Sequence, residues 1–164
     1  MRTNDAQKRI FESDGWSSAI AYSSDGKFLA QATSTGEISI WQIAAENCLL
    51  KLKTEWQIEQ LSFSPDNRSL MTDHGRLIPD CWPSNIESQN DGIQNNDDEN
   101  EPSNVPFAIQ GYGIGFHGTW LTKDGERIVW LPPEHRPRSN ALVADSVVVI
   151  RNSSDQLLMF GFDD

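Results

Sequence analysis

Two stretches of this chain repeat each other at a constant offset. AIAYSSDGKFLA begins at Ala19, and QLSFSPDNRSLM begins at Gln60. Aligning Ile20 with Leu61, or Asp25 with Asp66, gives the same offset of 41 residues. A constant offset of this size is typical of repeat proteins, in which each unit buries its apolar face only by packing on its neighbours.

The first copy predicts four short strands joined by tight turns, over residues 19–23, 27–33, 37–43 and 48–53. Apolar and polar residues alternate in these segments, as expected for strands with one buried face. Asp25-Gly26 and Thr35-Gly36 supply turn residues between them, because glycine accepts a positive φ without penalty. Four strands joined by hairpins within ~40 residues correspond to one blade of a β-propeller.

Later segments repeat this pattern less completely. The second copy predicts strands over 58–64, 68–72 and 76–79, and then fades. Another Asp-Gly hairpin signal, at Asp124-Gly125, precedes a strand over 127–131, and residues 141–144, 146–151 and 156–162 read as further strands. The chain is therefore predicted to be all-β.

Composition divides the chain into four parts. We predict an N-terminal segment at 1–15, two repeats at 16–82, a disordered acidic insert at 83–106 and degenerate C-terminal blades at 107–164. The insert is polar and contains Asn95-Asn-Asp-Asp-Glu-Asn-Glu101, so it lacks the apolar surface that could offset the entropy of ordering a chain. The remaining residues suffice for a partial propeller of about three to four blades.

The repeat motifs resemble those of WD40 proteins. The resemblance lies in Trp16-x3-Ile20-x-Tyr22 with the following Ser-Ser-Asp-Gly-Lys, in Thr35-Gly-x-Ile-x-Ile-Trp41, and in Leu61-Ser-Phe-Ser-Pro-Asp66. It implies a WD40-like β-propeller that binds proteins through its loops. The chain departs from the family in lacking a Gly-His pair before either first strand, and in carrying Gln42 where the family prefers Asp.

A narrower resemblance involves the C-terminal propeller portion of fungal NACHT/WD40 proteins of the vegetative-incompatibility type. It rests on Ser64-Pro-Asp-Asn-Arg-Ser-Leu-Met-Thr-Asp73 and on Trp130-Leu-Pro-Pro-Glu-His-Arg-Pro137. It implies a sensor for a nucleotide-driven switch encoded elsewhere. The chain itself has no Gly-x4-Gly-Lys-Ser/Thr phosphate loop, so nucleotide hydrolysis is not carried over.

Charge and cysteine content restrict the partners and the compartment. The net charge is -11, which repels nucleic-acid phosphates and anionic lipid headgroups. Two cysteines, Cys48 and Cys81, are too few for a disulfide-stapled secreted domain, and no segment reads as a signal peptide or a membrane span. We therefore expect a cytoplasmic protein that binds other proteins.

A search for catalytic patterns gives no candidate catalytic residues, metal ligands or cofactor. His74, His117 and His135 are isolated from other ligand types at metal-binding spacing, and turn or surface roles explain them better. Asp25, Asp66 and Asp124 recur at turns, where an aspartate side chain bonds its own backbone. The sequence thus favours a non-catalytic protein.

Tryptophans give the candidate binding residues. Trp41, Trp120 and Trp130 lie inside strand patterns and are predicted to be core. Trp16 and Trp56 precede the first strands of two repeats, where the resemblance implies a docking rim, and aromatic residues are typical of binding hot spots. With Arg136, which can pair with a partner's carboxylates, they form the predicted protein-binding set, although capping of the blades and a solvated loop explain the same residues.

The sequence therefore predicts a non-catalytic scaffold or sensor, with two alternatives left open. One is a gene fragment without independent function, and the other is a hydrolase on a propeller scaffold. Because closed propellers take ~4 to 8 blades, a partial array must belong to a longer product, close tightly or associate with another copy.

Overall fold

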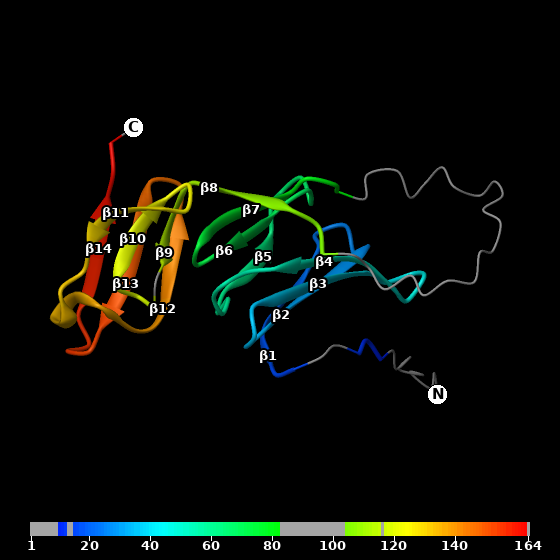
Figure 1. Cartoon of the computed structure of the whole chain (residues 1–164), viewed down its shortest axis with the longest axis horizontal. Helices are drawn as coiled ribbons and strands as arrows, with labels where there is room; N and C mark the ends of the chain where they lie inside the picture. The colour runs from blue at the N-terminus through cyan, green and yellow to red at the C-terminus, as the bar shows by residue number, and fades with distance from the viewer. Residues whose placement is uncertain (1–9, 13–14, 83–103, 116, 164) are drawn as a thin grey trace, which may run out of the picture.

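A computed structural model describes residues 10–12, 15–82, 104–115 and 117–163, which form four antiparallel sheets in chain order (Figure 1). Sheet A contains β1 (Ser17–Tyr22), β2 (Phe28–Thr33), β3 (Glu37–Gln42) and β4 (Asn47–Lys53). Sheet B contains β5 (Leu61–Phe63), β6 (Leu70–Thr72), β7 (Gly75–Pro79) and β8 (Phe107–Gln110). Sheet C contains β9 (Tyr112–Gly115), β10 (Trp120–Lys123) and β11 (Glu126–Trp130). Sheet D contains β12 (Pro137–Ala144), β13 (Val147–Asn152) and β14 (Leu157–Gly161), and a single turn of 3-10 helix, η2 (Pro133–His135), precedes it.

The repeated Ser-x-Asp sequence builds the same turn in sheets A and B. In sheet A, the Ser23 hydroxyl donates to Asp25 Oδ1 at 2.7 Å, and the Lys27 amide donates to the same oxygen at 3.1 Å. Ser64 and Asp66 repeat this arrangement in sheet B. In both turns the serine hydroxyl stabilises the charged carboxylate and lowers the aspartate pKa. These aspartates therefore have a structural role in the turns.

Sheet B takes its fourth strand from beyond the acidic insert. β8 pairs with β7 in the register Leu77 to Ile109 and Pro79 to Phe107. The expected repeat boundary at residue 82 therefore does not coincide with the end of this sheet. Residues 83–103 of the expected disordered insert lie outside the described residues. Its last residues are described, and the Val105 amide donates to the Lys51 carbonyl of β4 at 2.9 Å.

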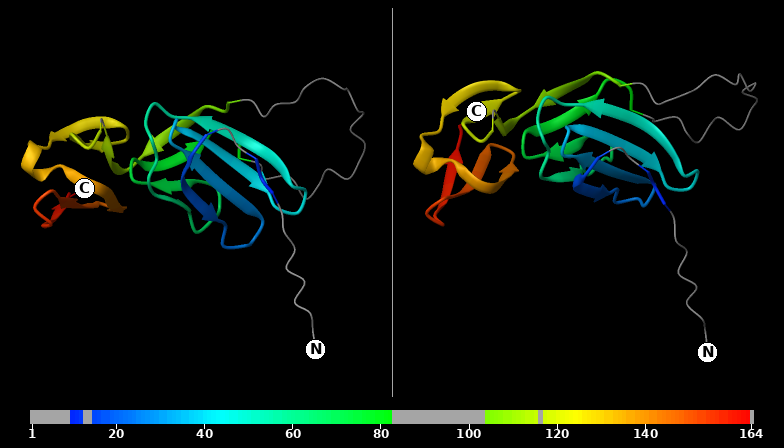
Figure 2. Two further views of the ribbon diagram at one scale, coloured as in Figure 1. Left: turned by 90° about the horizontal axis from the view of Figure 1, so that it is seen from below. Right: turned by 60° about the horizontal axis from the view of Figure 1, so that its bottom comes forward.

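Two separate cores hold the sheets in pairs. Sheets A and B share one apolar cluster, whose fully buried members include Ile38, Ile40, Leu70 and Leu77. Sheets C and D share another cluster around Leu121 and Ile150, among others. Figure 2 shows the two pairs side by side along the long axis of the molecule.

The two pairs of sheets differ in where their strands start. Sheets A and B start at the same end of the array, whereas sheets C and D start at opposite ends. The Ser24 hydroxyl and the Asn67 side chain hydrogen-bond to each other, so sheets A and B place equivalent turns together. Sheet D is reversed, because Pro137, at its start, lies beside Gly118, which follows β9, whereas Phe162, at its end, stacks on Tyr112, where β9 begins. The chain leaves a three-stranded antiparallel sheet at the end opposite to the one where it entered. Sheet D, which follows three-stranded sheet C, therefore begins at the opposite end from sheet C.

Burial of the strand tryptophans differs in part from the prediction. Trp41 is buried at 4% exposure, as expected for core, but Trp130 is 50% exposed and Trp120 is half-buried. The assignment of Trp130 to the core is wrong because β11 is the edge strand of sheet C, and every residue of this strand is exposed. The alternation of apolar and polar residues along β11 could not show that sheet C lacks a fourth strand beside it.

Candidate functional site

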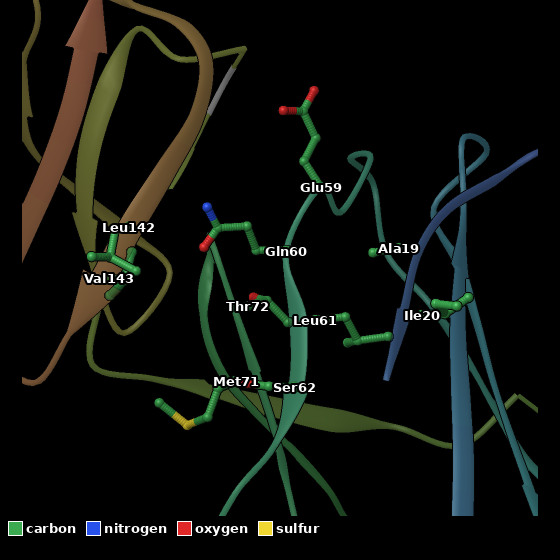
Figure 3. Close-up of a pocket in the computed structure, with 10 residues that line it drawn as sticks. All are labelled: Ala19, Ile20, Glu59, Gln60, Leu61, Ser62, Met71, Thr72, Leu142 and Val143. Carbon is green, nitrogen blue, oxygen red and sulfur yellow. The ribbon is translucent and has the colours of Figure 1, made fainter. Parts of the chain in front are cut away.

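A groove lies between sheet D and the first strands of sheets A and B. It consists of two adjoining cavities of about 450 and 560 Å³, and Met71 and Val143 line both. Figure 3 shows the residues that line its first cavity. Ile20 and Leu61 continue the apolar lining toward sheet A, and Leu142 continues it along sheet D. We call this surface the inner groove.

Strand alternation positions the two shared residues. On β6, Leu70 and Thr72 are buried toward sheet A, so Met71 between them projects from the opposite face of sheet B. On β12, Val143 packs partly against the core of sheets C and D, and its other side faces the groove. The groove therefore lies between two pairs of sheets, each of which has its own core.

Polar side chains line the second cavity. Arg76 donates from Nε to Ser69 Oγ at 2.6 Å, and its Nη2 lies 3.7 Å from the Asp66 carboxylate. Tyr112 accepts a hydrogen bond from Lys123 Nζ at 3.1 Å. Carboxylate and guanidinium groups therefore line this end of the groove, and Glu59, Gln60, Ser62 and Thr72 add polar groups to the lining of the first cavity.

The junction between the pairs is built on the turn between β6 and β7. The Ile114 amide of β9 donates to the Asp73 carbonyl at 2.8 Å. His74 lies in this turn, as its position beside Gly75 predicted, but its side chain is buried at 8% exposure and not at the surface. Its Nε2 lies 3.0 Å from the Gln57 carbonyl, its ring packs against Trp56, and Asp73 Oδ2 is 3.6 Å away.

Burial gives His74 a pH-dependent contribution to stability. Desolvation lowers the pKa of the imidazole from its usual 6.5, and the Asp73 carboxylate opposes this shift without cancelling it. The unfolded chain therefore binds a proton at higher pH than the folded chain does. The contribution of His74 is complete above pH 6.5 and is lost as pH falls toward the lower folded pKa.

We expect the free energy of unfolding to fall between pH 7 and 5, by about 1.4 kcal/mol for each unit of pKa difference. His74→Gln should flatten this dependence, because a neutral amide keeps a donor for the Gln57 carbonyl and does not titrate. Denaturant unfolding at several pH values gives the free energy of unfolding of the unaltered protein and of the variant. Carboxylates titrate mainly below this window. An unchanged slope in the variant would assign the pH dependence to other groups.

The structure places the three predicted binding residues as follows. Trp16 is 85% exposed, and its carbonyl accepts a hydrogen bond from the Ser34 amide. Trp56 lies near the same turn, since its carbonyl accepts from Thr54 Oγ1, which also donates to Gly36. Arg136 belongs to the other pair of sheets, donates to the Leu131 carbonyl at 3.1 Å and lies over the ring of Trp130. Trp16 and Trp56 therefore share one end of sheet A, apart from Arg136.

Sequence reasoning did not find the groove residues. Met71 lies at the end of the second copy of the repeat, and its outward position could be read from alternation in β6. Val143 could not be found this way, because the reversed sheet D brings it opposite sheet B.

The residues that the structure describes contain no group of three or more histidine, cysteine or acidic residues arranged to hold a metal ion. They also contain no helix long and apolar enough to span a membrane.

Comparison with known proteins agrees with the sheet arrangement. The crystal structure of the computationally designed Ika4 protein is similar with a TM-score of 0.51 at 13% identity, over 96% of this chain and 99% of that one. The chain folds as a partial β-propeller. A β-propeller domain of Cps50 (Swd1) from Myceliophteria thermophila gives a TM-score of 0.48 at 12% identity, over 90% of this chain and 54% of that one. This chain thus spans about half the length of the Cps50 domain.

At these identities the likeness concerns the fold alone. No protein-family model matches the sequence, and a search of curated proteins also gives no match.

Proposed function

We propose that this chain is a non-catalytic, WD40-type protein-interaction module whose inner groove binds an extended segment of a partner protein. The observation that carries this proposal is the pair of adjoining cavities sharing Met71 and Val143. Their volumes lie in the range of ~300–1,000 Å³ that is typical of ligand sites. Because they share Met71 and Val143, one extended ligand could contact both cavities.

The chemistry of the lining also suits a peptide. Methionine is flexible and polarisable, so Met71 can adapt to different apolar side chains. Arg76 and the carboxylates of Asp66 and Asp145 provide polar contacts at one end of the groove. Arg76 is held by Ser69 and Asp66, which supports a role in binding and turn structure rather than in chemistry.

A test uses peptides selected from a displayed random library against the immobilised chain. Met71→Asp should weaken binding of the selected peptides at least tenfold, because a bound peptide would desolvate a carboxylate at the position that the two cavities share. Ile128→Asp is the matched control, since Ile128 is 41% exposed on β11 and does not line the groove. Equal affinity of the Met71→Asp variant would exclude the groove as the binding site.

The predicted rim residues extend the proposal. Trp16 remains a proposed partner contact, and its 85% exposure makes it available to a bound protein. Trp56 and Arg136 are proposed as weaker contacts, because His74 and Trp130 already cover part of their side chains. Trp16→Ala in the same assay separates a rim contribution from a groove contribution.

The cellular setting follows from the sequence resemblance. We propose that the chain acts as the C-terminal sensor portion of a fungal, cytoplasmic NACHT/WD40 protein, in which partner binding at the propeller biases a nucleotide-driven switch. Association with a second copy is the other interaction that the open sheet array supports.

A further inference from the structure

The lining of the inner groove carries more acidic than basic side chains. Its two cavities are lined by the carboxylates of Glu59, Asp66 and Asp145 and by one guanidinium, that of Arg76. Arg76 Nη2 lies 3.7 Å from the Asp66 carboxylate, so these two charges largely offset each other. Glu59 and Asp145 form no ion pair with another residue that the structure describes. One uncompensated carboxylate therefore remains in each cavity.

The two carboxylates stand on either side of the residues that both cavities share. Glu59 precedes β5 and lines only the first cavity, and Figure 3 shows its carboxylate at one end of that cavity, away from Met71. Asp145 lies in the turn between β12 and β13 and lines only the second cavity, as does Ser64, which follows β5. Met71 and Val143 lie between the two cavities, so the groove has an apolar middle with a negative charge on each side.

Neighbouring charges leave this excess of negative charge in place. Asp73 Oδ1 accepts a hydrogen bond from the Glu59 amide at 3.2 Å, so a further carboxylate lies beside the first cavity. Desolvation lowers the pKa of the adjacent His74, so this imidazole does not offset Asp73 at pH 7. At the second cavity, Lys123 donates to Tyr112 at 3.1 Å and adds one positive charge. Lys123 and Asp73 offset each other, and the groove belongs to a chain with a net charge of -11.

We propose that the segment bound in the inner groove is basic, with lysine or arginine side chains on both sides of an apolar residue. The apolar residue packs on Met71 and Val143, one cation pairs with Glu59, and another pairs with Asp145. Position 64 follows position 59 by five residues along β5, or roughly 17 Å at ~3.3 Å per residue, so an extended segment of about six residues spans the groove. This inference rests on the proposed function of the groove and names the chemistry of its partner.

Charge complementarity favours a basic segment over an acidic or neutral one. An acidic segment would place like charges against Glu59 and Asp145, and such contacts suppress wrong partners. The net negative charge of the chain also attracts a cationic segment before contact and speeds its association. Exposed ion pairs contribute little to affinity individually, so these carboxylates act mainly by selecting the partner.

The first test determines the composition of peptides selected from the displayed random library against the full chain. Lysine and arginine should outnumber aspartate and glutamate among them. A second selection, against the Glu59→Lys/Asp145→Lys chain, should reverse this excess, because both flanking charges are inverted. Both residues are exposed, so the fold should be kept, and an unchanged thermal melt followed by circular dichroism checks this. The same composition in both selections would overturn the proposal.

Affinities of the selected peptides test the two carboxylates separately. Glu59→Gln and Asp145→Asn should each weaken binding about two- to fivefold, as for loss of an exposed ion pair. Glu55→Gln and Glu126→Gln are matched controls, since each also removes one negative charge from an exposed position but neither residue lines the groove. The controls should leave affinity nearly unchanged. Added salt should weaken binding to the unaltered chain more than binding to the Glu59→Gln/Asp145→Asn chain, because salt screens exposed charges.

Met71→Trp separates failure of this inference from failure of the proposed function. The larger side chain fills the position that both cavities share without adding a charge. Peptides that bind the unaltered chain but not this variant occupy the groove. If those peptides show no excess of lysine and arginine, or bind Glu59→Gln and Asp145→Asn unchanged, the basic partner is excluded and the groove remains a binding site. Equal binding to Met71→Trp would exclude the groove itself, and this inference with it.

Discussion

Replacement of Gly113 by alanine is expected to destabilise the protein by about 3 kcal/mol or more. A Cβ at this position would lie 2.3 Å from the His74 carbonyl carbon and 2.8 Å from the Gly75 nitrogen. These are backbone atoms, so no side-chain rotation relieves the overlap. The β6–β7 turn and β9 must move apart, and this contact joins the two pairs of sheets.

Thermal melting and hydrogen exchange measure this effect. For a chain of this length, 3 kcal/mol corresponds to a fall in Tm of roughly 6–12 °C. The Ile114 amide, which donates to the Asp73 carbonyl across the junction, should exchange faster than amides within sheet A.

Gly161→Ala is the matched control for this substitution. Gly161 is also a strand glycine, and an added Cβ there would meet nothing within 4 Å. Its effect should stay within about 0.5 kcal/mol, as for surface substitutions away from special features. Equal Tm values for the two variants would show that the junction tolerates the displacement.

Truncation of Leu121 and of Leu77 should each cost about 2–5 kcal/mol, the range for deletion of a buried leucine side chain. Both residues are fully buried, but they belong to different apolar clusters. Because the two clusters are separate, Leu121→Ala should destabilise sheets C and D first, and Leu77→Ala should destabilise sheets A and B first.

Hydrogen exchange resolved along the chain distinguishes the two variants. In Leu121→Ala, the amides of β9–β14 should lose protection while those of β1–β4 keep it, and Leu77→Ala should give the reverse. A uniform loss of protection over all four sheets in both variants would show that the array unfolds as one cooperative unit.

Much of the local structure could be predicted from the sequence. The 41-residue offset, the strand alternation and the Ser-x-Asp turns gave the all-β fold and a propeller-type arrangement, and the structure confirms both. β1 to β4 lie within two residues of the expected ranges. These features depend on neighbours in sequence, because glycine geometry, serine–aspartate hydrogen bonds and side-chain alternation act within a few residues.

Tertiary structure alone decided how these elements meet. Sheet B is completed by β8 from beyond the acidic insert, and three-stranded sheet C reverses the direction of sheet D. These pairings bury His74, expose Trp130 and bring Val143 opposite Met71. Alternation states that a residue faces one side of its strand, but not whether another sheet covers that side. Burial and the inner groove therefore followed only from contacts between residues far apart in the chain.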